Sequence, residues 1–153
     1  YCRLFGELFG FETVNLRYFN VYGPFLDPNG AYALVVDKFF RQRSNNEPMT
    51  ICGDGEYYRD YTHVSDIVEG NVLAMQSNKV GKGDIFNIGV GSATSVNKLA
   101  KLIGGATVFV PDRPGDPRRS EADNTRAREI LGWKPKVSLE EGITTMKKEW
   151  NLK

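Results

Sequence analysis

Apolar positions at the start of the chain follow helical spacing and then strand spacing. Residues 1–10 carry their large apolar side chains on one helical face, and Gly10 is placed to end that helix. No capping residue precedes the first turn, which is typical of a helix that begins further upstream. Residues 13–19 alternate between two faces, are rich in β-branched and aromatic side chains, and lead to the turn signal Gly23-Pro24. A helix followed closely by such a strand is half of an α/β unit.

The remaining pattern predicts short strands mixed with helices. Ser65 is the expected N-cap of one helix, and Ser138 with Glu141 forms a capping box at the start of the last helix. We expect strands at 49–52, 57–62, 84–88 and 107–110, and helices at 32–43, 65–77, 95–103, 124–131 and 138–150.

The composition is that of an ordinary globular chain. Of 153 residues, 41% are hydrophobic and 25% charged, and the net charge is +1, which favours neither a nucleic-acid partner nor repulsion from one. The apolar runs are far shorter than the roughly 20 residues of a membrane helix. Cys2 and Cys52 cannot form a disulfide framework. We therefore expect a cytoplasmic chain with no nucleic-acid or membrane partner.

Two candidate motifs are better explained as structure than as chemistry. Residues 89–94 follow a strand and precede a helix, as a dinucleotide loop does, but the third glycine position holds Thr94. A turn that needs two unhindered glycines is the preferred interpretation. His63 is the only histidine, and no cysteine or second histidine stands at metal-ligand spacing from it. We therefore predict no metal site.

Two arginines in turn-rich surroundings are the stronger candidates. Arg59 lies in a strand-like run and Arg113 in a Pro- and Gly-rich loop, and two guanidinium groups from separate segments can hold a diphosphate. The alternative is ion pairing at the surface, of Arg59 with Asp60 or Asp54 and of Arg113 with Asp116, which would stabilise the protein little.

Four segments, in this order, resemble the extended short-chain dehydrogenase/reductases and among them the NAD-dependent nucleotide-sugar 4-epimerases. They are residues 16–24 (LRYFNVYGP), Gly53-Asp54-Gly55 with Arg59-Asp60-Tyr61, residues 86–89 (FNIG), and residues 113–116 (RPGD) leading to Ala122-Asp123 and to 131–135 (LGWKP).

The resemblance implies an α/β fold that is the C-terminal part of such an enzyme. Residues 1–24 would be the last helix and strand of its Rossmann domain. Residues 25–153 would be the small mixed α/β lobe that binds substrate, with some segments returning to the Rossmann sheet.

The resemblance also implies roles for individual residues toward a UDP-sugar. Arg59 and Arg113 resemble the arginines that hold the two phosphates, and Asn20 the asparagine that contacts diphosphate and sugar. Asp66 looks structural, capping a helix and pairing near the Arg59 segment. The other positions are Asp116 at the ribose, Leu34, Thr50 and Cys52 at the uracil (partly through backbone groups), Tyr61 in the nucleotide pocket with packing as its alternative, and Tyr18 and Phe19 on the nicotinamide side.

Ser120 matches the position whose side-chain size helps to decide whether a 2-acetamido group fits. Because serine is small, we expect N-acetylated UDP-hexoses to be admitted as well as UDP-glucose and UDP-galactose.

The family's reaction is a redox epimerisation at C4 of the sugar, with NAD as cofactor and a Y-x-x-x-K pair as acid–base machinery. The chain contains neither that pair nor a G-x-x-G-x-x-G loop. We therefore expect a fragment that is inactive alone. By the family's usual spacing, the complete enzyme should have a lysine about six residues before Tyr1 and a tyrosine four residues before that lysine.

Three alternatives stay open. The chain could come from a nucleotide-sugar 4,6-dehydratase or decarboxylase of the same superfamily, or be a UDP-sugar-binding module without catalysis. It could also be a self-associating fragment or homodimer, because the strand at 13–19 would present an apolar edge.

Overall fold

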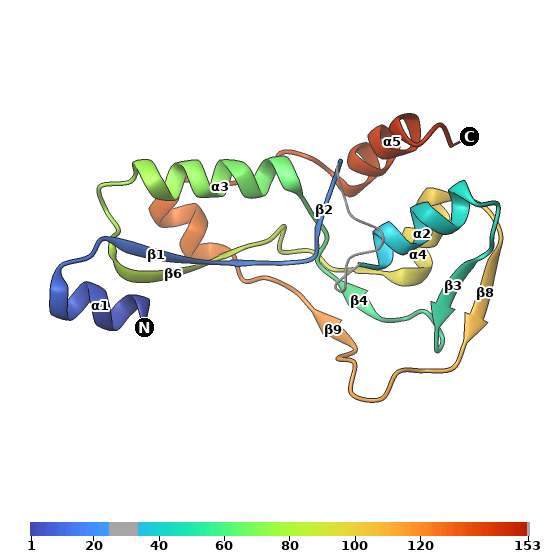
Figure 1. Ribbon diagram of the computed structural model, residues 1–153, viewed down its shortest axis with the longest axis horizontal. Coiled ribbons are helices and arrows are strands. Elements are labelled where there is room, and N and C mark those ends of the chain that lie inside the picture. The colour runs from blue at the N-terminus through green and yellow to red at the C-terminus, as the bar shows by residue number, and fades with distance from the viewer. Residues whose placement is uncertain (25–33, 153) are drawn as a thin grey trace.

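The computed structural model describes residues 1–24 and 34–152 as a mixture of helices and short strands (Figure 1). In chain order the elements are α1 (Cys2–Phe9), β1 (Thr13–Tyr18), β2 (Val21–Tyr22), α2 (Val35–Ser44), β3 (Met49–Cys52), β4 (Tyr58–Arg59), β5 (Thr62–His63), α3 (Val64–Gln76), β6 (Lys82–Ile88), β7 (Thr94–Ser95), α4 (Val96–Ile103), β8 (Thr107–Val110), β9 (Arg119–Ser120), the π-helix η1 (Ala127–Leu131) and α5 (Leu139–Glu149).

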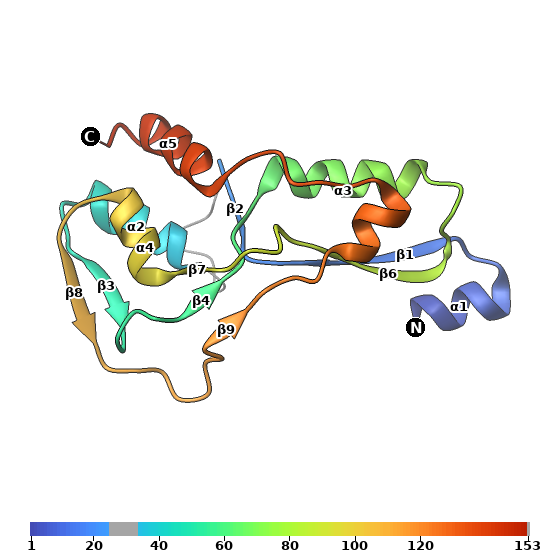
Figure 2. The same ribbon diagram turned by 180° about the vertical axis from the view of Figure 1, so that it is seen from behind.

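The strands pair mostly in parallel and over long sequence separations. β1 lies parallel to β6, with Leu16 opposite Phe86 and Tyr18 opposite Ile88, and β3 lies parallel to β8. β2 pairs with β5, and β4 joins β7 on one side and β9 on the other. α3 and η1 lie on one side of the β1–β6 pair and α1 on the other (Figures 1 and 2).

Two hydrophobic clusters form the core. The first packs α2, β3, α4 and α5 together, and the second packs β6 against α3 and η1. The buried side chains of the first are Tyr22, Val36, Phe39, Phe40, Met49, Ile51, Tyr61, Leu99, Ala100, Ile103, Ile143 and Met146. Those of the second are Ile67, Ala74, Phe86, Ile88, Ala127, Leu131 and Trp133.

Several local predictions are confirmed. Gly10 ends α1 in the left-handed conformation with φ of 70°, and β1 covers most of the predicted strand at 13–19. The capping box at α5 forms as expected, since the Ser138 hydroxyl accepts the Glu141 N–H while the Glu141 carboxylate accepts the Ser138 N–H. These features depend on neighbours in sequence, which is why the pattern predicts them.

Other local predictions are wrong in detail. α3 begins one residue earlier than expected, and its N-cap is His63 instead of the predicted Ser65. The Nδ1 atom of His63 accepts the capping hydrogen bond from the Ser65 N–H. The strand expected at 57–62 is broken between β4 and β5, where Asp60 is buried. The helix expected at 124–131 contains a π-helical turn. Residues 32 and 33, where the helix expected at 32–43 would begin, lie outside the described residues.

No helix in the described part of the chain is long and apolar enough to cross a membrane.

Candidate functional site

Seven of the nine residues predicted to bind substrate line one cleft of about 230 Å³. They reach it from the end of β1, the start of α2, β3, β4 and the loop of residues 111–118, which joins β8 to β9 (Figure 1). The seven are Asn20, Leu34, Thr50, Cys52, Arg59, Arg113 and Asp116, and the cleft is completed by Val35, Lys38, Tyr57 and Val96.

Arg59 is held rigidly at the cleft. Its guanidinium donates to the carbonyl oxygens of Pro117 at 2.7 Å and Tyr58 at 2.9 Å, and to Asp116 Oδ1 at 2.8 Å. Its side chain is only 14% exposed. The ion pairs considered from sequence, with Asp60 or Asp54, are wrong, because the loop of residues 111–118 brings Asp116 against Arg59 instead.

Arg113 has no such partner. No hydrogen bond or ion pair joins its guanidinium to another residue in the described ranges 1–24 and 34–152, and the pairing with Asp116 considered from sequence is not formed, since Asp116 is engaged by Arg59. Together with Lys38 the cleft therefore holds three cationic side chains against one carboxylate. This balance suits a doubly charged diphosphate, which guanidinium groups bind through paired hydrogen bonds.

The polar groups at β3 are partly used within the protein. The Gln42 side chain donates to Thr50 Oγ1 and accepts the Thr50 N–H, both at 3.1 Å. The Thr50 N–H is therefore not available to a bound base. Asn20 donates through Nδ2 to the Asp60 carbonyl oxygen at 3.3 Å, which ties it to the segment that carries Arg59.

The fully buried Asp60 carboxylate anchors this part of the fold. It accepts the backbone N–H groups of Val90 and Gly91 at 2.9 Å and of Ala122 at 3.1 Å. Gly89 has no room for a side chain beside Ala122, and Gly91 has φ of 79°. The loop at 89–94 thus uses the N–H groups of Val90 and Gly91 within the protein, which supports a structural turn over a dinucleotide loop.

Two predicted substrate residues lie outside the cleft. Tyr61 is 3% exposed within the first hydrophobic cluster, and burial raises the pKa of its hydroxyl, which has no hydrogen-bond partner among the described residues. The packing alternative therefore describes Tyr61. Ser120 pairs with Arg59 across β4 and β9, and its carbonyl oxygen accepts the Asp60 N–H at 3.0 Å.

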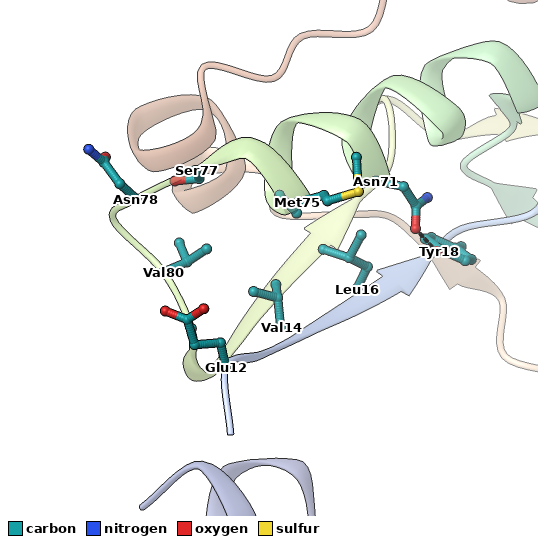
Figure 3. Close-up of a pocket in the computed structure, with 11 residues that line it drawn as sticks. Glu12, Val14, Leu16, Tyr18, Asn71, Met75, Ser77, Asn78 and Val80 are labelled. Carbon is teal, nitrogen blue, oxygen red and sulfur yellow. Dashed lines mark hydrogen bonds between the residues drawn. The ribbon is translucent and has the colours of Figure 1, made fainter. Parts of the chain in front are cut away.

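Tyr18 and Phe19, predicted for the nicotinamide side, lie apart from the cleft. The Tyr18 hydroxyl donates to Asn71 Oδ1 at 2.9 Å, at one end of a groove of about 530 Å³ between β1 and α3 (Figure 3). Phe19 packs its Cβ against Gly89. This groove is larger than the cleft, but it lacks the arginines that make the cleft a candidate for anion binding.

Asp66 is structural, as predicted, but its partners differ from those expected. Its carboxylate accepts the N–H groups of Lys136 and Val137, and its carbonyl oxygen accepts the Trp133 indole N–H at 2.8 Å. It therefore fastens the segment after η1 to α3, and not the Arg59 segment.

Sequence reasoning missed four cleft residues, of which two left a signal. Lys38 follows Leu34 by four residues, which places both on one face of α2. Tyr57 precedes Arg59 by two residues, the spacing of one strand face. Val35 and Val96 are apolar positions at helix starts that look like ordinary core positions.

The family of the chain is decided by comparison with known proteins. The model of the NAD dependent epimerase/dehydratase family matches residues 1–89, more than half of the chain. This chain belongs to that family.

Individual relatives agree with this assignment. A UDP-glucose 4-epimerase of Mycolicibacterium smegmatis is 42% identical over 149 residues, which cover 94% of this chain and 47% of the relative. UDP-glucuronic acid decarboxylase 2 of Arabidopsis thaliana is 36% identical over 140 residues, covering 88% of this chain and 30% of the relative. The crystal structure of the UDP-glucose 4-epimerase of Thermotoga maritima with UDP-glucose is 45% identical, with a TM-score of 0.87 over 97% of this chain and 48% of that one.

The chain thus spans about half the length of the epimerases it matches. The resemblance to the extended short-chain dehydrogenase/reductases, and the fold class that it implied, are confirmed.

Proposed function

We propose that this chain is the nucleotide-binding part of a UDP-sugar 4-epimerase. The observation that carries the proposal is the meeting of Arg59, Arg113 and Asn20 in one cleft from segments far apart in sequence. The Thermotoga maritima relative was solved with UDP-glucose, which agrees with this ligand class.

The cleft supplies a firm hold on the nucleotide. Arg59 and Arg113 would bind the two phosphates, with Asn20 between nucleotide and sugar, and Leu34 and Cys52 would pack on the base. Asp116 would reach the ribose while it also orients Arg59. Firm binding of this handle leaves the hexose to be held loosely, as a sugar that must present both faces at C4 requires.

The described residues do not fit a bound NAD on their own. The loop at 89–94 already donates its Val90 and Gly91 N–H groups to Asp60, so these two groups are not available to a pyrophosphate. We therefore propose that the chain alone does not interconvert UDP-glucose and UDP-galactose. Robust turnover by the isolated chain would contradict this.

Calorimetric titration with UDP tests the nucleotide site. Arg113→Ala removes a guanidinium that pairs with no residue in the described part of the chain, so it should weaken UDP binding about tenfold or more without changing the melting temperature. Arg119→Ala is the matched control, because Arg119 pairs with the exposed Glu121 and lies outside the cleft. Equal binding by both variants and the unsubstituted chain would overturn the proposal.

The sugar preference is a separate part of the proposal. In the complete enzyme Ser120→Tyr should abolish turnover of UDP-GlcNAc and spare UDP-glucose, because the larger side chain would occupy the space of the acetamido group. Equal loss of both activities would show that Ser120 does not select the sugar.

Epimerisation is proposed over decarboxylation because the epimerase relative is 42% identical and the decarboxylase 36%. Incubating the complete enzyme with UDP-glucose and with UDP-glucuronic acid separates the two reactions. The domain boundary near residue 24, self-association and a cytosolic location stay predictions.

A further inference from the structure

Tyr57 lies at the centre of the contacts that hold the loop of residues 111–118. It is 7% exposed, and its hydroxyl donates a hydrogen bond to Asp112 Oδ1. The Arg118 guanidinium lies 4.6 Å from the centre of its ring, and the Arg59 guanidinium 5.8 Å. One side chain, from the residue just before β4, thus contacts the loop near both of its ends.

The Asp112 oxygen that accepts the Tyr57 hydroxyl also accepts the backbone N–H of the next residue, Arg113. The Arg113 N–H donates to the same Oδ1 atom at 2.9 Å, and the Asp116 N–H closes a turn on the Arg113 carbonyl oxygen at 3.3 Å. A side chain at Gly53, where φ is 58°, would come within about 3 Å of this oxygen. The hydroxyl of Tyr57 is therefore connected through one oxygen atom to the backbone that carries the Arg113 guanidinium.

A second contact secures the far end of the loop. Arg118 donates to both carboxylate oxygens of Asp54, at 2.6 and 3.1 Å. More than half of each side chain is exposed, so this ion pair by itself stabilises the loop little. Tyr57 is buried and is the stronger of the two anchors.

We propose that Tyr57 is a positioning residue, which orients Arg113 through Asp112 and so sets the affinity of the cleft for a nucleoside diphosphate. This inference rests on the proposed function. The Asp112 hydrogen bond also raises the pKa of Tyr57. Since the ordinary pKa of a tyrosine is about 10, the hydroxyl is a donor at neutral pH in any case.

Tyr57→Phe tests the inference, because it keeps the ring and its arginine contacts and removes only the hydroxyl. It should weaken UDP binding between about threefold and tenfold in calorimetry, the effect of losing one hydrogen bond that orients a ligand. The chain offers a matched control in Tyr58→Phe. Tyr58 also donates to a carboxylate, Glu56 at 2.8 Å, and lies under an arginine, Arg119, but does not line the cleft.

The route through Arg113 has its own test. In an Arg113→Ala background, Tyr57→Phe should cause no further loss of UDP affinity, since the group it positions is gone. An equal loss in both backgrounds, or equal effects of Tyr57→Phe and Tyr58→Phe, would overturn the inference.

A measurement without ligand separates this inference from the proposed function. Tyr57→Phe should speed hydrogen exchange at the Arg113 and Asp116 amides, whereas Tyr58→Phe should not. If the unsubstituted chain fails to bind UDP, the proposed function fails. Unchanged exchange in Tyr57→Phe would show separately that Tyr57 does not hold the loop.

Discussion

The two ends of the molecule differ in how completely they bury their apolar side chains. At the cleft end, α2, α4 and α5 turn their large apolar residues into the first hydrophobic cluster. At the other end, α1 buries no residue at all, and the apolar side chains of one face of α3 are exposed. The exposed group comprises Leu4, Phe5, Leu8, Phe9, Phe11, Val68, Val72 and Met75.

The two ends also differ in how their strand edges and apolar faces are covered within the described residues. β1 pairs with β6 alone among the described strands, so its other edge offers backbone groups next to the exposed apolar faces. Such an edge binds another strand readily. At the cleft end, by contrast, α2, β3 and α4 pack against one another in the first hydrophobic cluster, and seven predicted residues line one cleft beside it.

The largest expected effect comes from the residue that joins the two ends. Asp60→Ala would remove the buried carboxylate that accepts the N–H groups of Val90, Gly91 and Ala122, and only the Val90 N–H keeps a second acceptor, Thr62 Oγ1 at 3.3 Å. The substitution should therefore lower the free energy of unfolding by about 3 kcal/mol. Chemical denaturation measures this.

Asp60→Asn is the graded control for that change, since an amide keeps one acceptor oxygen and the shape of the side chain. It should cost less than Asp60→Ala. A melting curve unchanged by Asp60→Ala would show that the two ends are not held together by this carboxylate.

The next effect concerns association. Sedimentation velocity should show concentration-dependent self-association of the chain, and replacing Leu8 and Phe9 by Glu should shift it to monomer without loss of helix content, because both side chains are already exposed. Phe109→Glu is the matched control, an equally apolar residue that is 58% exposed at the cleft end.

If Phe109→Glu abolishes association and the α1 substitutions do not, the prediction that the chain associates through α1 is contradicted. A clean monomer of the unsubstituted chain would also contradict it.

The smallest effect is expected inside the finished cluster. Tyr61→Phe removes a buried hydroxyl that no described residue satisfies, so stability near neutral pH should change by no more than about 1 kcal/mol, toward stabilisation. UDP binding should be unchanged, because Tyr61 lies outside the cleft.

Alkaline pH provides a second measurement on the same variant. Burial raises the pKa of Tyr61, so the folded chain keeps this proton at a pH where the unfolded chain, with a tyrosine pKa of about 10, has released it. Stability therefore falls as the pH rises above about 10. The fall should be shallower in Tyr61→Phe, with Tyr22 accounting for part of what remains because burial raises its pKa as well. An identical pH dependence would show that Tyr61 titrates as in the unfolded chain.

Much of the fold and of the site could be predicted because both depend on short motifs. The alternation at β1, the glycine after α1 and the capping box of α5 involve neighbours within a few residues. The motifs around Arg59 and Arg113 indicated the family, and seven of the nine residues predicted with them to bind substrate line one cleft. The ionic partner of Arg59 could not be predicted, because Asp54 and Asp60 are closer in sequence than Asp116. In the folded chain Asp54 pairs with Arg118 and Asp60 accepts backbone N–H groups, so neither pairs with Arg59.

The sequence by itself determined the local elements, the family and the residue types available for phosphate binding. The tertiary structure alone decided which of these residues meet. Arg59 pairs with Asp116 across 57 positions, Asp60 binds the Ala122 N–H across 62, and Tyr57 holds Asp112 across 55. The reason is physical. Helix caps and strand alternation arise from contacts within a turn or two, whereas a cleft is built from segments that only the packing of the hydrophobic clusters brings together.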